Sequence, residues 1–174
     1  MAKTRTVGLL VEQDFQDMEV MYPYYRFKEA GHKIVVIGTG TAERYKGKFG
    51  YPIDVQTQAS RMRAGSLDAL VIPGGWAPDF LRRHEAVNRL VRDCVTGGKV
   101  VGAICHAGSV LVSAGVLAGR TVTCFFAIRA DVEAAGARFV DREVVVDGNL
   151  VTSRKPDDLP AFCREILKAL DSKG

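Results

Sequence analysis

Several features of specialised proteins are missing from this sequence of 174 residues. No apolar run approaches the ~18 residues that a transmembrane helix needs. No block of five like charges occurs and the formal net charge is only +4, so charge alone does not imply a nucleic-acid partner. The N-terminus lacks a long apolar segment followed by a small-residue cleavage site. These absences favour a cytoplasmic protein with no membrane partner.

Motifs for disulfides, metals and cofactors are also missing. The four cysteines are widely spaced and form no Cys-x-x-Cys pair: Cys94, Cys105, Cys124 and Cys163. A disulfide scaffold would be denser in cysteine, and a structural zinc site would show paired ligands. No His, Asp or Glu cluster has metal-ligand spacing, and neither a phosphate loop nor a complete dinucleotide fingerprint occurs. We therefore expect free thiols, no metal and no cofactor.

The composition is ordinary for one globular domain, with 47% hydrophobic and 25% charged residues, and we expect a single domain over residues 1–174. Apolar runs without alternation predict strands buried on both faces. These predicted strands cover residues 5–11, 33–37, 68–72 and 99–104, followed by two short strands at 143–146 and 150–152. Helical spacing predicts helices over residues 14–30, 84–96, 106–114, 127–135 and 156–170, and residues 45–51 resemble a hairpin. This alternation predicts an α/β fold, with a mostly parallel sheet covered by helices on both faces.

Ligands of such sheets bind beyond the carboxyl ends of the strands. Three segments with unusual residues end at that edge: Val11-Glu12, Pro73-Gly74-Gly75-Trp76 and Ile104-Cys105-His106. The sequence therefore predicts a site there.

Cys105 lies between a buried strand and a helix, and its neighbours are small: Gly102 and Ala103 before it, Ala107 and Gly108 after it. A nucleophile on a tight strand-to-helix turn needs such neighbours, because larger side chains collide where the backbone reverses. The helix N-terminus is expected to lower the pKa of the thiol and to stabilise a thiolate. Most lone cysteines are small buried hydrophobes, but position and flanks together favour a reactive Cys105.

Two residues are candidate partners of this thiol. Glu12 directly follows a strand, and it reaches Cys105 if the first and fourth predicted strands are adjacent; the alternative is an ordinary helix-capping Glu. His106 would form a Cys–His pair of the kind that activates thiols, although consecutive side chains usually point apart. Gly74 and Gly75 permit a turn whose N–H groups face a substrate oxygen, or they form a simple loop.

The sequence resembles the PfpI-like branch of the ThiJ/PfpI superfamily over nearly its whole length. The segments that carry the resemblance are Ala103-Ile104-Cys105-His106-Ala107, Leu70-Val71-Ile72-Pro73-Gly74-Gly75, residues 144–154, Pro156-x-Asp158-Leu159-Pro160 and Glu12-x-x-Phe15-x-Asp17-x-Glu19. The resemblance implies a flavodoxin-like three-layer sandwich and a homodimer or higher homo-oligomer. It also implies Cys105 as nucleophile, Glu12 as its carboxyl partner and His106 as base. In peptidase-like members an acidic residue completes a triad across a subunit interface; here that position is Asp79, one methylene shorter than the usual Glu.

Three functions follow from the resemblance and the residues. The first is a stress-response enzyme that acts on small reactive carbonyls or their adducts through Cys105, in the manner of a glyoxalase or deglycase. The second is an intracellular cysteine peptidase that uses Cys105, His106 and Asp79. The third is an oxidant sensor or chaperone-like protein that responds through oxidation of Cys105. A catalyst needs a pocket beside Cys105, whereas a sensor needs only access for peroxide.

Overall fold

The computed structural model describes residues 3–172, so both ends of the predicted domain lie outside the described part. The strands are β1 (Thr6–Leu10), β2 (Lys33–Gly38), β3 (Arg44–Lys46), β4 (Pro52–Asp54), β5 (Thr57–Gln58), β6 (Ala69–Ile72), β7 (Val100–Ile104), β8 (Thr121–Val122), β9 (Arg138–Phe139), β10 (Val144–Asp147) and β11 (Leu150–Ser153). The α-helices are α1 (Asp17–Glu29), α2 (Ala77–Leu81), α3 (Glu85–Thr96), α4 (Gly108–Ala114), α5 (Arg129–Ala134) and α6 (Leu159–Asp171).

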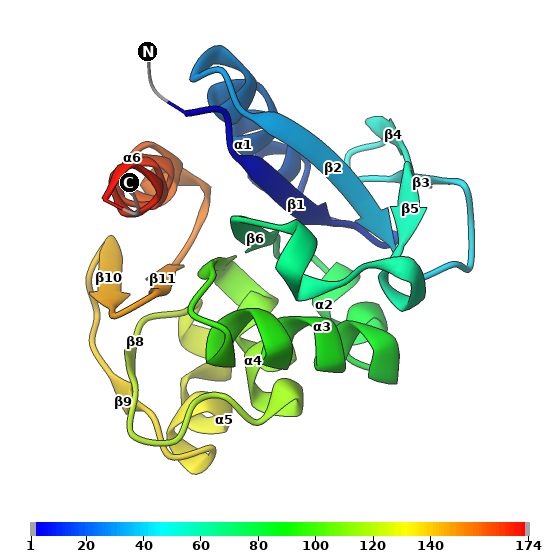
Figure 1. The fold of residues 1–174 in the computed structure, drawn as a ribbon. Helices are drawn as coiled ribbons and strands as arrows, with labels where there is room; N and C mark the ends of the chain where they lie inside the picture. Colours follow the sequence, from blue (N-terminus) through cyan, green and yellow to red (C-terminus); the bar gives the residue numbers. More distant parts are fainter. Residues whose placement is uncertain (1–2, 173–174) are drawn as a thin grey trace.

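Seven strands form the central sheet, in the order β10-β11-β7-β6-β1-β2-β5 (Figure 1). All neighbouring pairs are parallel except β10 and β11, which form an antiparallel hairpin. The central strands β6 and β7 are buried along their whole length, which explains why their sequences are apolar without alternation. The predicted, mostly parallel sheet is confirmed.

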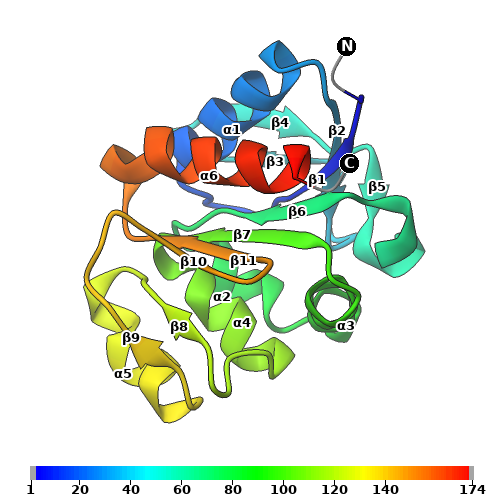
Figure 2. The ribbon, with the colours of Figure 1, turned by 60° about the vertical axis from the view of Figure 1, so that its left-hand side comes forward.

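Helices cover both faces of the sheet. Helices α1 and α6 pack together on one face, and α3 and α4 pack on the other, as Figure 2 shows. Gly102 in β7 allows the close approach of α6, because a Cβ atom there would lie 2.5 Å from Ile166 Cδ1 and 2.8 Å from Phe162 Cζ. The arrangement is the three-layer α/β sandwich predicted from the sequence.

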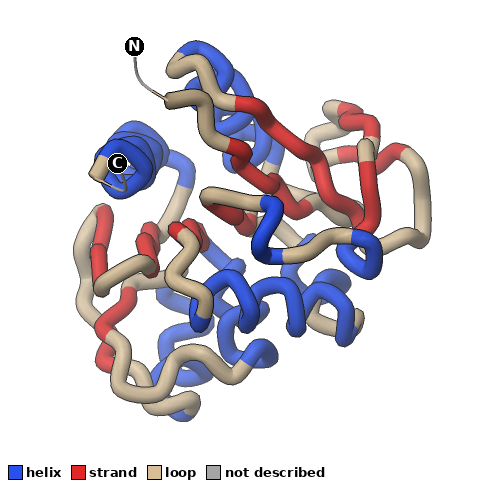
Figure 3. The backbone as a smooth tube through the Cα atoms, viewed as in Figure 1, coloured by secondary structure: helices blue, strands red, loops and turns tan. Residues whose placement is uncertain are grey.

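Most of the predicted elements are present with slightly shifted ends, including the β3–β4 hairpin (Figure 3). Four elements were not predicted: α2, β5, β8 and β9. They have five residues or fewer, which is too short for a periodic pattern to emerge. Across residues 3–172, no helix combines the length and the apolar character required to cross a bilayer.

Candidate active site

Cys105 occupies a tight turn at the carboxyl end of β7. Its φ angle is +62°, in the left-handed region that non-glycine residues rarely adopt. A single 3-10 turn, Cys105–Ala107, then leads into α4. Such strained residues persist only where the surroundings hold them in place, and they cluster at functional sites. The predicted turn at Cys105 is confirmed, and the residue is 8% exposed, so the thiol is buried but not sealed off.

Gly74 is required by the close packing around this thiol. A Cβ atom at Gly74 would lie 2.7 Å from Cys105 Cβ and 2.6 Å from Glu19 Oε2. Any side chain at this position would therefore push the thiol and the carboxyl apart. The N–H of Gly74 donates to Glu19 Oε2 at 2.6 Å, so it does not face a substrate oxygen as predicted.

Two backbone N–H groups do face the sulfur. Gly75 and His106 each donate a backbone hydrogen bond to Cys105, and both bonds favour the ionised form of the thiol. Gly75 has a φ angle of +79°, which glycine adopts without strain. The structure thus places Gly75, but not Gly74, where its N–H can stabilise negative charge on the nucleophile.

Glu19, on the first turn of α1, is the carboxyl that pairs with Cys105. Its side chain is fully buried, and its second oxygen, Oε1, has no nitrogen or oxygen partner among the described residues. Burial raises the pKa of this carboxyl from an ordinary value of 4.5 to about 7, because an ionised carboxylate is costly away from water. A carboxyl with such a pKa gains or loses its proton near neutral pH.

The expectation of a lowered thiol pKa is wrong for the resting site. Burial, and then the negative charge of Glu19, raise the pKa of Cys105 to about 12. The two N–H groups oppose these effects without overcoming them. The resting sulfur is therefore a protonated thiol beside a carboxyl group.

The prediction that Glu12 pairs with Cys105 is also wrong. It required β1 and β7 to be neighbours, but β6 lies between them. The Glu12 carboxylate instead accepts hydrogen bonds from the hydroxyl groups of Thr39 and Thr41 and from the N–H of Gln13. Glu19 belongs to the motif that carries the family resemblance, but no pattern in the sequence assigns it to the thiol, because it lies inside a predicted helix, where an acidic residue near the N-terminus has an ordinary electrostatic explanation.

His106 contacts the thiol despite being its sequence neighbour. Its Nδ1 lies 3.4 Å from Cys105 Sγ, because the unusual backbone at Cys105 turns the two side chains toward each other. The imidazole is flanked by Phe125, at 4.8 Å between ring centroids, and by Trp76, at 6.3 Å. Burial, followed by the positive charge of Lys48, lowers the pKa of His106. The ring is therefore neutral at pH 7 and able to accept a proton.

A cavity of about 400 Å³ opens next to Gly75 and His106, the two residues whose N–H groups face the sulfur; Cys105 itself is not among the residues that line it. Its lining includes Gly75, Trp76, Asp79 and His106. Asp79 is exposed and forms an ion pair with Arg83. Within the described chain, no contact joins Asp79 to His106, so these two predicted triad members are brought to the same cavity but not together.

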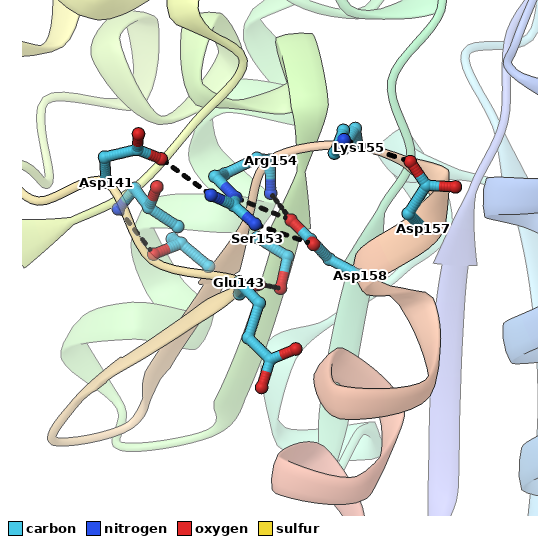
Figure 4. Close-up of polar contacts among 9 residues, drawn as sticks. Asp141, Glu143, Ser153, Arg154, Lys155, Asp157 and Asp158 are labelled. Atoms are coloured by element: carbon cyan, nitrogen blue, oxygen red, sulfur yellow. Dashed lines mark hydrogen bonds and ion pairs between the residues drawn. The ribbon is translucent and has the colours of Figure 1, made fainter.

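The motif Ser153-Arg154 with Asp158 forms a neighbouring structural cluster. Arg154 follows β11, whose last residue pairs with the residue before Cys105. Its side chain donates to Asp158 at 2.9 and 3.1 Å and to Asp141 at 2.7 Å (Figure 4). These bonds tie the end of β11 to the start of α6 and to the loop before β10. They hold the strand beside β7 in place.

Comparisons with known proteins match nearly the whole chain. Residues 5–169 match the DJ-1/PfpI family. "Deglycase PfpI" of Pyrococcus furiosus is 45% identical over 161 residues, which cover 92% of this chain and 96% of that protein. "General stress protein 18" of Bacillus subtilis is 41% identical, covering 96% and 98% of the two chains. A crystal structure from Anabaena variabilis, a two-domain protein with DJ-1/ThiJ/PfpI-like and ferritin-like domains, superimposes with a TM-score of 0.94 at 41% identity, covering 96% of this chain and 48% of that one.

Proposed function

Because the chain belongs to the DJ-1/PfpI family, we propose that it is a cysteine-dependent stress-response enzyme that acts on small reactive carbonyl compounds or their early adducts. The deglycase name of the Pyrococcus furiosus relative supports this substrate class, and the name of the Bacillus subtilis relative supports the role in stress. The observation that carries the proposal is the buried pairing of Glu19 with Cys105 beside an open cavity.

In the first step, Glu19 acts as general base for the thiol. The pKa of its carboxyl, about 7, suits a base at neutral pH, because about half of the groups are ionised there and the carboxylate still binds a proton well. As the sulfur attacks the aldehyde carbon, a carbon–sulfur bond forms and the thiol proton passes through Glu19 to the carbonyl oxygen. The N–H groups of Gly75 and His106 stabilise negative charge on the sulfur during attack. The product of this step is a hemithioacetal.

For a 2-oxoaldehyde, the second step is a proton shift between neighbouring carbons. The former aldehyde carbon loses its proton to Glu19 or to the neutral ring of His106, and the proton returns to the adjacent carbon. The first carbon is thereby oxidised and the second reduced, which leaves a thioester on Cys105. Water then hydrolyses the thioester to a hydroxy acid and frees the thiol. The sum of these steps adds one water to the substrate.

The peptidase remains a second candidate, supported by the 3.4 Å distance between Cys105 Sγ and His106 Nδ1. To complete the triad, a carboxylate must accept a hydrogen bond from the imidazole of His106. In one chain Asp79 is paired with Arg83 instead, so the carboxylate would have to come from a second copy of the protein. An active site at the interface between two copies would admit only small or unfolded substrates.

The oxidant sensor is less well supported. A sensor needs only a path for peroxide, whereas the cavity beside Cys105 has room for a small substrate.

The test is methylglyoxal consumption with lactate as the measured product. We expect turnover by the wild type that rises with pH through about 7, as Glu19 ionises. Cys105→Ala should lower turnover by at least about 1000-fold, since covalent catalysis is lost, whereas turnover by the buried control Cys124→Ala should stay within a few-fold of the wild type.

Equal turnover in Cys105→Ala and the wild type would refute the proposal. An inactive wild type whose Cys105 is still oxidised by peroxide would favour the sensor, and peptide cleavage lost in Asp79→Asn would favour the peptidase.

A further inference from the structure

The β3–β4 hairpin lies near the carboxyl end of β2 (Figure 1), and its turn is connected to the candidate site. Phe15 connects the two, because it pairs with Gly47 of the hairpin turn on one side and with Gly75 on the other. The backbone N–H of Lys48 also donates to the carbonyl oxygen of Phe15 at 2.9 Å. Since Gly75 contacts the sulfur of Cys105, only one residue, Phe15, separates the hairpin turn from a loop that contacts the thiol.

A buried carboxylate fixes the conformation of this turn. Asp17 Oδ2 accepts the N–H of Phe49 and Asp17 Oδ1 accepts the N–H of Tyr51, each at 3.0 Å. Asp17 lies two residues before Glu19 on the first turn of α1. The same helical turn therefore positions both the carboxyl at the thiol and the hairpin beside it.

Lys48 projects from this fixed turn without an acidic partner. Within residues 3–172 it forms no ion pair, and its ammonium group lies 5.1 Å from the ring centre of the neighbouring Phe49. Its charge nevertheless reaches the site, because it favours the ionised form of Glu19 and the neutral form of His106. Its turn is joined through Phe15 to the loop of Gly75, and an unpaired cation on a rigid turn at the edge of a site can receive an anion.

We propose that Lys48 binds an anionic group of the substrate, so that the site prefers carbonyl compounds that carry a carboxylate over neutral ones of the same size. This inference rests on the reactive thiol of the proposed function. The ammonium group is compact and sits on a flexible stem, so it can meet a carboxylate near the carbonyl that Cys105 attacks. The hydroxy acid formed from such a substrate is also an anion, and Lys48 would bind it in the same way.

Two alkylating reagents of nearly equal size test this inference, because iodoacetate carries a carboxylate and iodoacetamide is neutral. The rate of Cys105 alkylation by each reagent is measured by mass spectrometry of the Cys105 peptide, and the two rates are expressed as a ratio. A change in thiol ionisation alters both rates equally and leaves the ratio unchanged. In Lys48→Gln we expect the iodoacetate-to-iodoacetamide ratio to fall about 3- to 10-fold, as expected for one charge contact near a protein surface.

Lys46→Gln is the matched control, since Lys46 is an exposed lysine of the same hairpin. Its ratio should stay at the wild-type value, and 0.5 M salt should lower the wild-type ratio toward that of Lys48→Gln. An unchanged ratio in Lys48→Gln, or an equal fall in Lys46→Gln, would overturn the role of Lys48 while leaving the reactive thiol intact. Failure of both reagents to alkylate Cys105 in the folded wild type would instead remove the reactive thiol on which the proposed function stands.

Discussion

At the scale of single residues, the site depends on which carboxyl reaches the sulfur. Glu12 and Glu19 are both buried acidic residues near the start of α1, but their environments differ. Glu12 is satisfied by threonine hydroxyl groups, whereas Glu19 retains an oxygen without a nitrogen or oxygen partner among the described residues. A buried polar atom left in this way destabilises the fold, so its presence calls for an explanation. Here the purpose that we propose is proton transfer with Cys105.

Substitution of the two glutamates separates these roles. Glu19→Gln should lower methylglyoxal turnover by about 100-fold or more, because the amide cannot accept the thiol proton. Glu12→Gln should change turnover only a few-fold, since its bonds to Thr39 and Thr41 lie away from the thiol. Initial rates at pH 8 provide the comparison. Equal losses in the two variants would show that Glu19 has no special part in the reaction.

The raised pKa of Glu19 also predicts a pH-dependent cost in stability. The folded protein holds the Glu19 proton more tightly than the unfolded chain does, since the pKa of the carboxyl rises from 4.5 to about 7. Stability is therefore lost as pH rises from about 4.5 through 7, by roughly 3 kcal/mol in total. Glu19→Gln lacks this titration. Its free energy of unfolding, relative to the wild type, should increase by about 2–3 kcal/mol between pH 5 and pH 8.

Urea unfolding at the two pH values measures this difference. Glu12→Gln serves as the control for loss of a buried carboxylate. If Glu19→Gln changes the free energy of unfolding, relative to the wild type, by the same amount at pH 5 and at pH 8, Glu19 does not ionise in the folded state over this range.

At the scale of elements, short loops rather than helices and strands make the site precise. The loop after β6 passes so close to the loop before α1 that Gly75 pairs with Phe15. This contact brings the N–H of Gly75 to the sulfur on the turn after β7. The loop after β6, the turn after β7 and the first turn of α1 thus bring together the thiol, its N–H donors and its carboxyl at one edge of the sheet.

Replacement of Gly75 by alanine tests this assembly. The added Cβ would lie 2.6 Å from the carbonyl oxygen of Asp14 and would overlap the backbone nitrogen of Gln16. We expect a loss of unfolding free energy of about 2–3 kcal/mol together with slower alkylation of Cys105. Gly31→Ala is the control, because Gly31 also has a positive φ angle, +83°, but nothing lies within 4 Å of its added Cβ. Gly31→Ala should lose only about 1 kcal/mol and leave alkylation unchanged.

At the scale of the whole molecule, we propose that copies of the chain associate through the outer face of α1. Met18 and Tyr25 on that helix are 52% and 57% exposed, and with Met21 and Tyr22 they line a shallow depression. Apolar groups gathered on one face favour an interface with another copy. Phe27 lies on the opposite side of the same helix: its side chain is buried in the core and does not contribute to this outer face.

Sedimentation at several protein concentrations tests this interface. Tyr25→Glu should shift the protein toward a smaller species, because burial of the new charge in an interface is unfavourable. Val146→Glu on β10, another exposed apolar position, is the control and should leave the distribution unchanged. Identical sedimentation of Tyr25→Glu and the wild type would exclude this face of α1 as the interface.

The α/β architecture and the sharp turn at Cys105 could be predicted from the sequence alone. Both depend on local patterns: apolar strands that alternate with helices, and small residues around Cys105 that permit a sharp turn. The three-dimensional fold was needed to show which carboxyl meets the thiol, because strand order is not encoded in linear spacing and β6 separates β1 from β7. It also decided the sign of the thiol's pKa shift, since burial and the charge of Glu19 outweigh the N–H groups. These properties depend on neighbours that are distant in the chain, so no local pattern could reveal them.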